Sequence, residues 1–430
     1  MPPGPLSDRL EILTGGPVRG TVQPPGSKSL TNRALVCAAL ADGSSLLRGA
    51  LFSEDTEVMI QSLGALGVPV QADSKAGQLR VIGCRGVLPA DEAQLYTANS
   101  GTTIRFLTAV TTLGRGPYRL DGVPRMRQRP IGDLINALRG LGADVTSEAG
   151  NGCPPVIVRG RGLAGGRAAI RGDVSSQYLS ALLLVAPYAR EDVQLELDGP
   201  LVSRPYVTMT ERVMESFGVT VDRGDGQAYR VAAGQRYRGQ EYAIEPDASA
   251  ASYFWAAAAI TGGSVTVSGL DHSSLQGDVQ FCDCLARMGC DVRTAGGQTT
   301  VAGARLRGIE ADMHAISDTV QTLAAVALFA EGSTTIRGVG HIRHKETDRI
   351  GDLARELRRL GAHVEELADG LRITPGPLHG SAVETYHDHR MAMSLALVGL
   401  RVPGIVILDP GCTAKTYPGY FRDLQALRRR

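Results

Sequence analysis

The sequence predicts an α/β protein with two similar domains, each built from three copies of one repeat. Two observations support this prediction: a glycine motif that ends a helix recurs along the chain, and an earlier helical segment precedes each copy of the motif. With 430 residues, the chain is long enough for two or three domains that have cores of their own.

The glycine motif occurs five times. The segments are LGALGVPV, LRGLGADV, MESFGVTV, LARMGCDV and LRRLGAHV, with glycines at Gly67, Gly142, Gly218, Gly289 and Gly361. Successive glycines are separated by 75, 76, 71 and 72 residues. Glycine readily adopts the left-handed conformation that closes a helix, so each motif predicts a helix end. A β strand and a hairpin should follow, as in AHVEELADGLRITP.

Each copy also contains an earlier helix. The six segments are SKSLTNRALVCAALA, NSGTTIRFLTAVTTLG, DVSSQYLSALLLVAPYA, DASAASYFWAAAAITGG, SDTVQTLAAVALFAEG and DHRMAMSLALVGL. We therefore predict six copies of about 70 residues, a unit larger than the common solenoid repeats. Three copies fit the usual size of one domain.

The domain boundary is expected between the third and fourth copies, near YRGQEYAIEPDAS. The sixth copy ends just before its glycine, so we expect the N-terminal segment RLEILTGGPVRGTVQPPG to complete that domain. One domain would then comprise residues 1–25 with 246–430, and the other residues 26–245. Two chain crossings, near residues 25 and 245, predict a hinge and a cleft.

Composition excludes several classes of function. A net charge of +1, one Trp and seven Phe argue against nucleic acid as the main partner. No run of about 18 to 20 apolar residues predicts a membrane span. The N-terminus lacks a charged-then-apolar signal pattern, so we expect a cytoplasmic protein. The seven cysteines have no zinc-like spacing, and those of FCDCLARMGC are predicted to be core thiols.

Lysine is rare in this chain. The 45 basic residues include only four lysines: Lys28, Lys75, Lys345 and Lys415. A lysine retained in an arginine-rich chain indicates a place where a compact, titratable ammonium group is needed. Lys28, Lys345 and Lys415 lie in polar segments at predicted helix starts.

Most side chains that could bind a ligand lie at helix starts, in PPGSKSLTNR, YTANSGTTIR, PRMRQRPIGDL, GDVSSQY, LVSRPYVT, HKETDRI, YHDHRMAM and CTAKTYPGY. Arg129 comes just before Pro130, which is a favoured first residue of a helix. Helix starts present free N–H groups and a partial positive charge, which favour small anions. Guanidinium groups suit carboxylates, whereas ammonium and hydroxyl groups suit phosphate. The pattern predicts substrates with both phosphate and carboxylate groups.

Simpler interpretations remain open for some of these residues. Ser175, Ser176 and Ser203 could be ordinary helix caps, as could Asp318. Gly101 could only relieve a turn.

The charged residues also have simpler interpretations. Arg125, Arg127 and Arg129 could form a solvated surface cluster. Glu346 could form an ordinary ion pair with its neighbour Lys345. Two histidines, at 387 and 389, flank an aspartate, but no further ligands with a recognisable spacing accompany them, so we predict no metal site.

Together these segments resemble the 5-enolpyruvylshikimate-3-phosphate (EPSP) synthase family of enolpyruvyl transferases. The resemblance covers nearly the whole chain, through PGSKSLTNRAL, NSGTTIRFL, PRMRQRPIGDL, SSQYLSALLL, LVSRPY, QGDV, KETDR, DHRMAM and CTAKTYPGYF, in that order. It implies two domains, each of three βαβαββ-like units arranged as an inside-out α/β barrel, with the substrate cleft between them. It also suggests a monomer, and no cofactor is expected.

The resemblance implies transfer of the enolpyruvyl group of phosphoenolpyruvate to the 5-hydroxyl of shikimate 3-phosphate, with release of phosphate, through a tetrahedral intermediate. Phosphoenolpyruvate would be bound by Lys28, Gly101, Arg129, Gln177, Arg349, Arg390 and Lys415. Shikimate 3-phosphate would be bound by Lys28, Ser29, Arg33, Ser175, Ser176, Gln177, Ser203, Tyr206, Asp318, His341 and Lys345.

Three residues are expected to move protons. Glu346 would carry a proton to and from the methylene carbon of phosphoenolpyruvate. Lys28 and Asp318 would manage the proton of the 5-hydroxyl, and the sequence leaves open which of them is the base.

Three positions deserve comparison with the family pattern. His341 and His387 stand where members of the family commonly have Asn. Gly101 matches the glyphosate-sensitive form, because a side chain there would crowd the inhibitor more than the substrate.

Two alternatives were weighed against this function. The related transferase that acts on UDP-N-acetylglucosamine usually has a reactive Cys in the loop that matches DGVPRMRQRP, and this loop has none. A non-catalytic, anion-binding repeat protein has no need for Lys28, Asp318 and Glu346 together.

Overall fold

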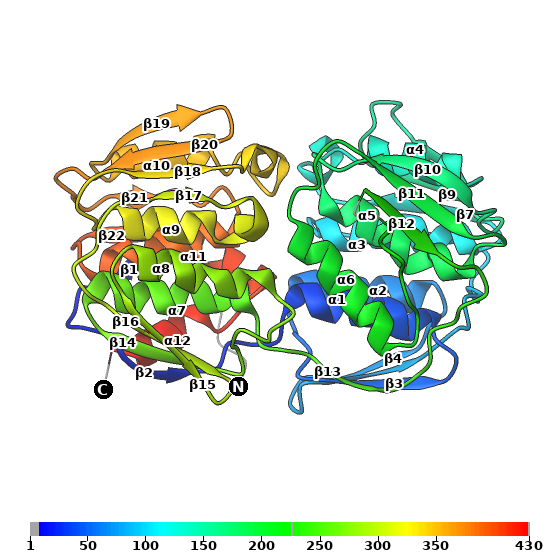
Figure 1. The fold of residues 1–430 in the computed structure, drawn as a ribbon, viewed down its shortest axis with the longest axis horizontal. Coiled ribbons are helices and arrows are strands. Elements are labelled where there is room, and N and C mark those ends of the chain that lie inside the picture. Colours follow the sequence, from blue (N-terminus) through cyan, green and yellow to red (C-terminus); the bar gives the residue numbers. More distant parts are fainter. Residues whose placement is uncertain (1–7, 225–226, 429–430) are drawn as a thin grey trace. The chain divides into compact units, whose positions relative to one another are not determined.

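The computed structural model describes residues 8–224 and 227–428. The chain divides into two compact units. Unit 1 comprises residues 1–25 and 245–430, and unit 2 comprises residues 26–244. Among the described residues, each unit contains six α-helices and three small sheets (Figure 1). The predicted α/β class with a repeated unit is confirmed, and the described strands form separate sheets of three or four strands.

Unit 2 contains the first three repeats. Its helices are α1 (Lys28–Leu40), α2 (Glu54–Ala65), α3 (Gly101–Val110), α4 (Gly132–Gly140), α5 (Ser176–Val185) and α6 (Arg204–Ser216). Its first sheet has the order β13 (Glu241–Ala243), β3 (Ser44–Arg48), β5 (Gln78–Ile82), β4 (Val70–Asp73). The second has the order β6 (Ala93–Tyr96), β7 (Pro117–Asp121), β9 (Val156–Arg159), β8 (Asp144–Ser147). The third has the order β10 (Gly166–Arg171), β11 (Val193–Asp198), β12 (Ala228–Val231).

Unit 1 contains the other three repeats. Its helices are α7 (Ala248–Thr261), α8 (Phe281–Arg287), α9 (Val320–Ala327), α10 (Gly351–Arg359), α11 (His389–Ala396) and α12 (Tyr420–Ala426). One sheet has the order β2 (Arg19–Val22), β14 (Ser264–Ser268), β16 (Gln298–Ala302), β15 (Asp291–Ala295). Another has the order β17 (Glu310–Asp312), β18 (Thr334–Arg337), β20 (Gly370–Thr374), β19 (His363–Leu367). The last has the order β21 (Ala382–Val383), β22 (Ile405–Leu408), β1 (Arg9–Ile12).

All six sheets share one strand arrangement. A parallel pair forms one side of each sheet, for example β6 with β7, and an antiparallel strand follows, as β9 does on β7. In the sixth repeat the antiparallel strand comes from the N-terminus, because β1 pairs with β22 in a register that places Arg9 opposite Leu408. The N-terminal segment therefore completes the short sixth repeat.

The motif glycines end helices as predicted. All five adopt positive φ values between 81° and 112°, and they follow α2, α4, α6, α8 and α10. This conformation is strained for residues with a side chain, which explains why glycine recurs at this point of each repeat. The six earlier helices, α1, α3, α5, α7, α9 and α11, also lie within the predicted segments.

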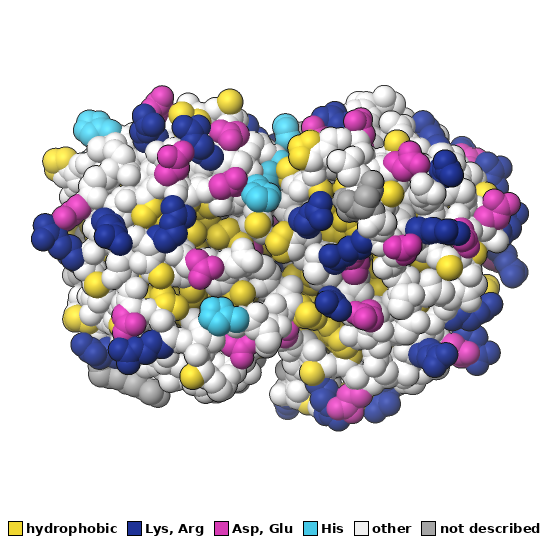
Figure 2. All heavy atoms as spheres, viewed as in Figure 1, with side chains coloured by type: hydrophobic (Ala, Val, Ile, Leu, Met, Phe, Trp, Pro, Cys, Tyr) yellow, Lys and Arg dark blue, Asp and Glu magenta, His cyan; other side chains and the backbone are white. Residues whose placement is uncertain are grey.

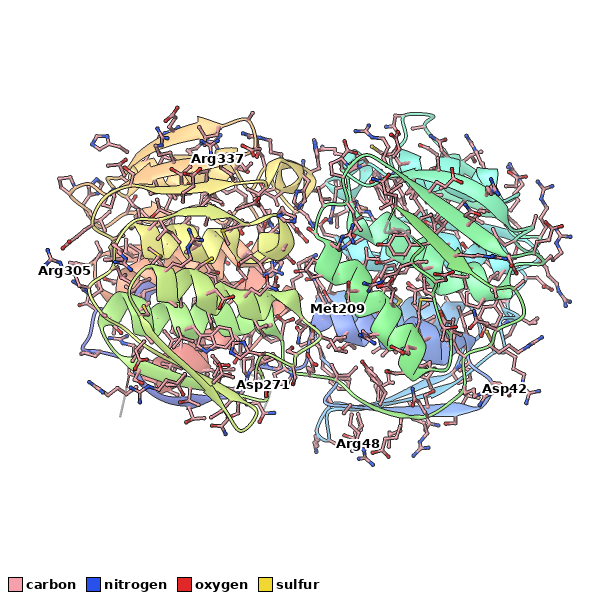
Figure 3. The ribbon with its side chains drawn as sticks, in the orientation of Figure 1. Asp42, Arg48, Met209, Asp271, Arg305 and Arg337 are labelled. Atoms are coloured by element: carbon pink, nitrogen blue, oxygen red, sulfur yellow. The ribbon has the colours of Figure 1, made fainter. Side chains whose placement is uncertain are left out.

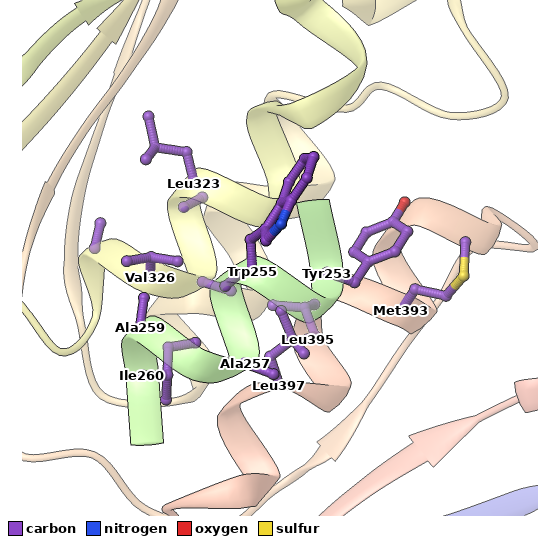
Figure 4. Close-up of a cluster of buried hydrophobic side chains, with 14 of the residues drawn as sticks. Tyr253, Trp255, Ala257, Ala259, Ile260, Leu323, Val326, Met393, Leu395 and Leu397 are labelled. Carbon is purple, nitrogen blue, oxygen red and sulfur yellow. The ribbon is translucent and has the colours of Figure 1, made fainter. Parts of the chain in front are cut away.

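The core of unit 1 is built around α7. All 14 residues of this helix are buried, and its central AAAA run lets neighbouring helices approach closely. Side chains of α9 and α11 belong to the same buried cluster as Trp255 (Figure 4), and the indole N–H of Trp255 donates to the carbonyl of Thr299 at 3.1 Å. The apolar side chains along α10, from Ile350 to Leu360, are likewise buried. This core holds the helix starts of unit 1 in fixed positions.

No helix in the described part of the chain is long and apolar enough to cross a membrane.

Gly64, inside α2, and Gly67, just after its end, provide a test of the helix-ending motif. Gly67 has φ 81°, and a Cβ there would lie 2.8 Å from the Cβ of Pro89. We predict that Gly67→Ala lowers the free energy of unfolding by about 1–3 kcal/mol. Gly64, inside α2, would place a Cβ in open space, so Gly64→Ala should raise the free energy of unfolding by about 0.5–1 kcal/mol. Urea denaturation measures both, and equal effects would contradict the motif's role.

Candidate active site

Unit 1 holds a cluster of six charged side chains at its helix starts. All six come from segments that precede or begin α9, α10, α11 or α12. We call this the unit 1 cluster, and its members are the cations Arg349, Arg390 and Lys415 and the carboxylates Asp318, Glu346 and Asp388. Five of the six were predicted site residues, and Asp388 is the addition.

Arg349 lies at the centre of the unit 1 cluster. Its Nε and Nη2 donate to the two carboxylate oxygens of Asp388, at 2.6 and 3.1 Å. Nη2 also lies 2.7 Å from Oε2 of Glu346, and Nη1 lies 3.4 Å from Oδ1 of Asp318. The side chain is only 2% exposed. A buried guanidinium thus meets three carboxylates.

The other two cations share these carboxylates. Nη2 of Arg390 donates to Oδ2 of Asp318 at 2.6 Å, so Asp318 bridges two arginines. Nζ of Lys415 lies 3.8 Å from Oε1 of Glu346. Glu346 therefore pairs with Arg349 and Lys415. Asp318, which lies at the start of α9, pairs with Arg349 and Arg390.

The electrostatics of Arg349 reflect this arrangement. Burial lowers the pKa of the guanidinium, but the negative charges of Asp388, Glu346 and Asp318 outweigh burial, so the pKa lies above its ordinary value. The carboxylates therefore favour the charged form of Arg349.

Ion pairs at the surface differ from those of the unit 1 cluster. Arg48 and Arg305 point away from the body of their units, where they pair with the exposed side chains of Glu241 and Glu331 (Figure 3). Basic and acidic side chains are interspersed over the viewed face (Figure 2). Solvated pairs of this kind contribute little to stability, whereas a buried cation depends on its partners.

The segment before α10 divides into caps and cluster members. Asp348 accepts from the backbone N–H groups of Ile350 and Gly351, both at 3.1 Å, so it caps α10. Thr347 instead donates to the carboxylate of Asp352. Lys345, half-buried, ends the preceding 3-10 turn.

His341 lies in that same turn. Its Nε2 is 3.2 Å from Oγ of Ser317, one residue before Asp318. Burial, with the positive charge of Lys345, lowers the pKa of His341 to about 3. The imidazole is therefore neutral at physiological pH, and it can offer a hydrogen bond but no charge.

In unit 2, the start of α1 places three of the predicted residues. Nζ of Lys28 lies 3.6 Å from Oδ2 of Asp55, which is 2% exposed. Ser29 follows it in the first turn of the helix. Arg33 is buried, and its guanidinium donates to Oγ1 of Thr210 at 2.7 Å and to the carbonyl of Ser29 at 2.9 Å.

Arg33 was predicted to bind a substrate carboxylate, a role that suggests an exposed guanidinium, but its guanidinium is buried among protein groups. Nη2 also donates to the carbonyl of Tyr206 at 3.1 Å, and the group lies 5.3 Å from the ring centroid of Phe106. Burial lowers the pKa of Arg33 to about 10. These acceptors use only part of the five N–H donors of the guanidinium.

A second group of unit 2 surrounds Gly101, the first residue of α3. A Cβ on Gly101 would lie 2.4 Å from Nη2 of Arg129 and 2.5 Å from Nη1 of Arg105. Arg105 donates to the carbonyl of Gly101 at 3.1 Å and to Oε1 of Gln177 at 2.8 Å. Arg129 donates to the backbone carbonyl of Asn99 at 3.0 Å. The absence of a side chain at 101 lets two guanidinium groups reach this helix start.

The loop around Arg129 differs from the prediction. Helix α4 begins at Gly132, two residues after Pro130, so Pro130 is not its first residue. Arg129 is buried, which excludes the solvated-surface interpretation for this residue, whereas Arg127 is half exposed and pairs with Asp121 at 2.7 Å.

The serines of unit 2 take different roles. Oγ of Ser175 accepts from the backbone N–H of Gln177 at 3.3 Å, so Ser175 caps α5, and Ser176 is the first residue of that helix. Ser203 precedes α6 in a left-handed conformation, φ 52° and ψ 42°, and its side chain does not cap the helix. Tyr206 lies in the first turn of α6, partly buried.

Sequence reasoning missed two residues that organise these groups. Asp388 was considered only as a neighbour of His387 and His389, although it is the closest partner of Arg349. Arg105 was not selected as a site residue, although it links Gly101 to Gln177. The signal for both was present in the segments DHRMAM and NSGTTIRFL, but linear order does not reveal which side chains meet.

The histidines of YHDHRMAM do not form a metal site. His387 is exposed and lies 2.7 Å from Asp409, whereas His389 is buried beside Asp388. Among residues 8–224 and 227–428, no group of three or more His, Cys, Asp or Glu is placed to hold a metal ion.

Comparisons with known proteins show the family to which the chain belongs. A family model described as EPSP synthase (3-phosphoshikimate 1-carboxyvinyltransferase) matches residues 12–424. The 3-phosphoshikimate 1-carboxyvinyltransferase of Nostoc punctiforme is 53% identical over 417 residues, which cover 96% of this chain and 98% of that protein. The enzyme of that name from Methanoculleus marisnigri is 47% identical over 417 residues, with the same two coverages.

Solved structures give the same result for the fold. EPSP synthase from Acinetobacter baumannii superposes with a TM-score of 0.80 at 27% identity and covers 98% of both chains. The enolpyruvyl transferase NikO from Streptomyces tendae has a TM-score of 0.75 at 21% identity, with coverages of 97% and 96%, which shows a shared fold only.

The lowered pKa of His341 gives a prediction for acid stability. The unfolded chain protonates His341 near pH 6.5, whereas the folded protein keeps it neutral down to about pH 3. The unfolded state therefore binds more protons in this window, and stability present above pH 6.5 is lost as the pH falls towards 3. We predict that His341→Asn reduces the loss of melting temperature between pH 7 and about pH 5.

The matched control is the exposed His272, whose replacement by Asn should leave the acid dependence unchanged. Equal pH profiles for wild type and His341→Asn would show that the imidazole is not kept neutral by the fold.

Proposed function

Because the chain belongs to the EPSP synthase family, we propose that the polar groups of unit 1 and unit 2 act on one pair of substrates, phosphoenolpyruvate and shikimate 3-phosphate. The protein is a transferase of the shikimate pathway, which leads to the aromatic amino acids. It transfers the enolpyruvyl group of phosphoenolpyruvate to the 5-hydroxyl of shikimate 3-phosphate and releases phosphate.

The observation that most supports the proposed site is the convergence of Arg349 and Arg390 on one carboxylate, with Lys415 beside Glu346. Two guanidinium groups aimed at one point suit the carboxylate of phosphoenolpyruvate. The ammonium group of Lys415 suits its phosphate. Glu346 lies within ion-pair distance of both Arg349 and Lys415, and we propose that it reaches the methylene carbon.

Unit 2 supplies the other proposed contacts of phosphoenolpyruvate. Arg129 and Lys28 would bind its phosphate, and Gln177 would lie nearby. The absence of a side chain at Gly101 would let the anion approach the start of α3, where backbone N–H groups and the helix dipole favour negative charge.

The acceptor contacts are proposed from the remaining residues. The phosphate of shikimate 3-phosphate would be held by the hydroxyl and ammonium groups of Ser175, Ser176, Ser203 and Lys345. His341 would add a neutral hydrogen bond. Ser29 and Arg33 would bind the acceptor's carboxylate, and Tyr206 would lie along its ring.

The proposed chemistry has two steps. We propose that Glu346 first delivers a proton to the methylene carbon of phosphoenolpyruvate, which becomes a methyl group. The 5-hydroxyl then attacks the adjacent carbon, and its proton passes to Lys28 or Asp318. In the second step Glu346 takes a proton back from the methyl group while the C–O bond to phosphate breaks. The double bond is restored in the product.

The two chain crossings are proposed to form a hinge. They lie near residues 25 and 245. Closure at this hinge would exclude water from the reacting groups. We further propose that the enzyme is a monomer in the cytoplasm, and sedimentation velocity tests the oligomeric state.

Phosphate release tests the function directly. The purified protein should release phosphate from phosphoenolpyruvate when shikimate 3-phosphate is present, and not when UDP-N-acetylglucosamine replaces it. Release with the sugar nucleotide alone would favour the related transferase. Release with neither acceptor would favour a protein that only binds anions.

Glu346→Gln tests the proton carrier. The amide keeps the shape of the side chain but cannot deliver a proton, so we predict a fall in kcat of about 10²–10⁴-fold. The dissociation constant of shikimate 3-phosphate, measured by calorimetry, should change little. The control is Glu365→Gln, an exposed glutamate of β19, which should leave kcat unchanged. Near-normal kcat in Glu346→Gln would remove Glu346 from the proposed chemistry.

Gly101→Ala tests the crowded start of α3. The new Cβ would collide with the guanidinium groups of Arg105 and Arg129, so we predict a rise of about tenfold in the KM of phosphoenolpyruvate. The wild-type enzyme should be inhibited by glyphosate, and the substitution should raise the inhibitory concentration more than it raises KM.

Gly132→Ala is the matched control, because Gly132 is also a first helical residue but its Cβ would meet only ordinary contacts, at 3.5 Å. Normal wild-type turnover at millimolar glyphosate would contradict the predicted sensitivity.

A further inference from the structure

Asp318 occupies an unusual position in the unit 1 cluster. One oxygen of its carboxylate lies 3.4 Å from Nη1 of Arg349, and the other lies 2.6 Å from Nη2 of Arg390. The two guanidinium groups come from different helix starts and meet on this single carboxylate. They are also the two groups proposed to bind the carboxylate of phosphoenolpyruvate.

The other close partner of Arg349 has a different character. Asp388 is fully buried, takes both Nε and Nη2 of Arg349, and accepts from the backbone N–H of Arg390 as the cap of α11. These contacts make Asp388 a fixed support. Asp318 is 15% exposed, the most exposed of the three carboxylates, and its contact with Arg349 is the longest of that arginine's ion pairs. It is therefore the carboxylate most easily exchanged.

The charge of the cluster points in the same direction. Its three cations are matched by three carboxylates, so its formal charge is zero when all are ionised. A balanced cluster offers little attraction to an anion that carries both a carboxylate and a phosphate. If one carboxylate leaves the arginines, the remaining groups present a net positive charge to the ligand.

We propose that Asp318 holds the place of the substrate carboxylate, and that phosphoenolpyruvate displaces it from Arg349 and Arg390 when it binds. This inference rests on the proposed function and adds a coupling to it. A carboxylate that loses two cationic partners becomes a stronger base. Binding of phosphoenolpyruvate thus prepares Asp318 to accept the proton of the 5-hydroxyl, as the O–H bond of the acceptor breaks and one forms on Asp318.

The coupling also protects the reaction. While phosphoenolpyruvate is absent, Asp318 is held by the arginines and is a poor base. The base becomes available only when the enolpyruvyl donor has arrived, so proton removal and attack occur in the same complex.

The test is the affinity for phosphoenolpyruvate alone, measured by titration calorimetry without the acceptor so that no turnover occurs. Asp318→Asn keeps the shape of the side chain but removes the competing charge. If a protein group must leave before a ligand binds, the apparent affinity equals the intrinsic affinity multiplied by the fraction of molecules in which that group is displaced. Asp318→Asn should therefore tighten the binding of phosphoenolpyruvate about fivefold or more. Turnover should be lost in the same variant.

Asp388→Asn is the control, because it removes the same charge from the other side of Arg349. It should not tighten binding, since it weakens the support of the guanidinium. Equal tightening in both variants would mean that any lost negative charge raises affinity, and would overturn the proposal. Unchanged or weaker binding in Asp318→Asn would overturn it as well.

Folding of each variant is checked by its thermal transition, and Asp318→Ala replaces Asp318→Asn if the latter does not fold. The wild-type phosphate-release assay separates the two levels of the argument. An active wild type with no gain of affinity in the Asp318 variants defeats this inference alone, whereas an inactive wild type defeats the proposed function.

Discussion

The burial of the Arg349 guanidinium is the constraint on which the candidate site of unit 1 depends. A buried charge without partners costs several kcal/mol, so the fold must bring carboxylates to it. Asp388, Glu346 and Asp318 meet this requirement from the starts of α11, α10 and α9. One cation therefore fixes three helix starts relative to one another, and the repeats that supply them must pack in register. The buried helix α7 and its neighbours provide the rigid core that this register needs.

At the start of α3, unit 2 positions two arginines through neutral oxygens. Arg105 donates to the carbonyls of Gly101 and Pro130 and to the amide oxygen of Gln177, and Arg129 donates to the backbone of Asn99. Neutral oxygens hold a guanidinium in place without cancelling its charge. The cluster of unit 1 is instead balanced. The two units therefore hold their arginines differently. Neutral oxygens position them at the start of α3, whereas carboxylates that an anion could replace hold them in the unit 1 cluster.

The repeated helix ends could be predicted from the sequence because the backbone conformation of a helix-ending glycine depends mainly on nearby residues. A glycine that ends a helix has a fixed place in its repeat, and Gly67 through Gly361 all adopted the expected conformation. Side-chain partners are not local. Arg349 and Asp388 are 39 residues apart, and spacing alone could not pair them. The start of α4 was also misjudged, because Pro130 follows a 3-10 turn that carries the chain two residues further before the helix begins.

Backbone strain occurs just before three of the segments that contain proposed site residues. Ala98, Ser203 and Asp409 have φ values of 47°, 52° and 49°, although each has a side chain. They lie directly before the segments that contain Gly101, Tyr206 and Lys415. Such conformations cost about 1–3 kcal/mol each and persist only where the surrounding structure demands them. At Ser203 the left-handed turn also keeps the hydroxyl from capping α6, unlike Ser175 on α5. The strained turn at Ser203 thus leaves the Ser203 hydroxyl out of the cap of α6, so that this hydroxyl can bind a ligand.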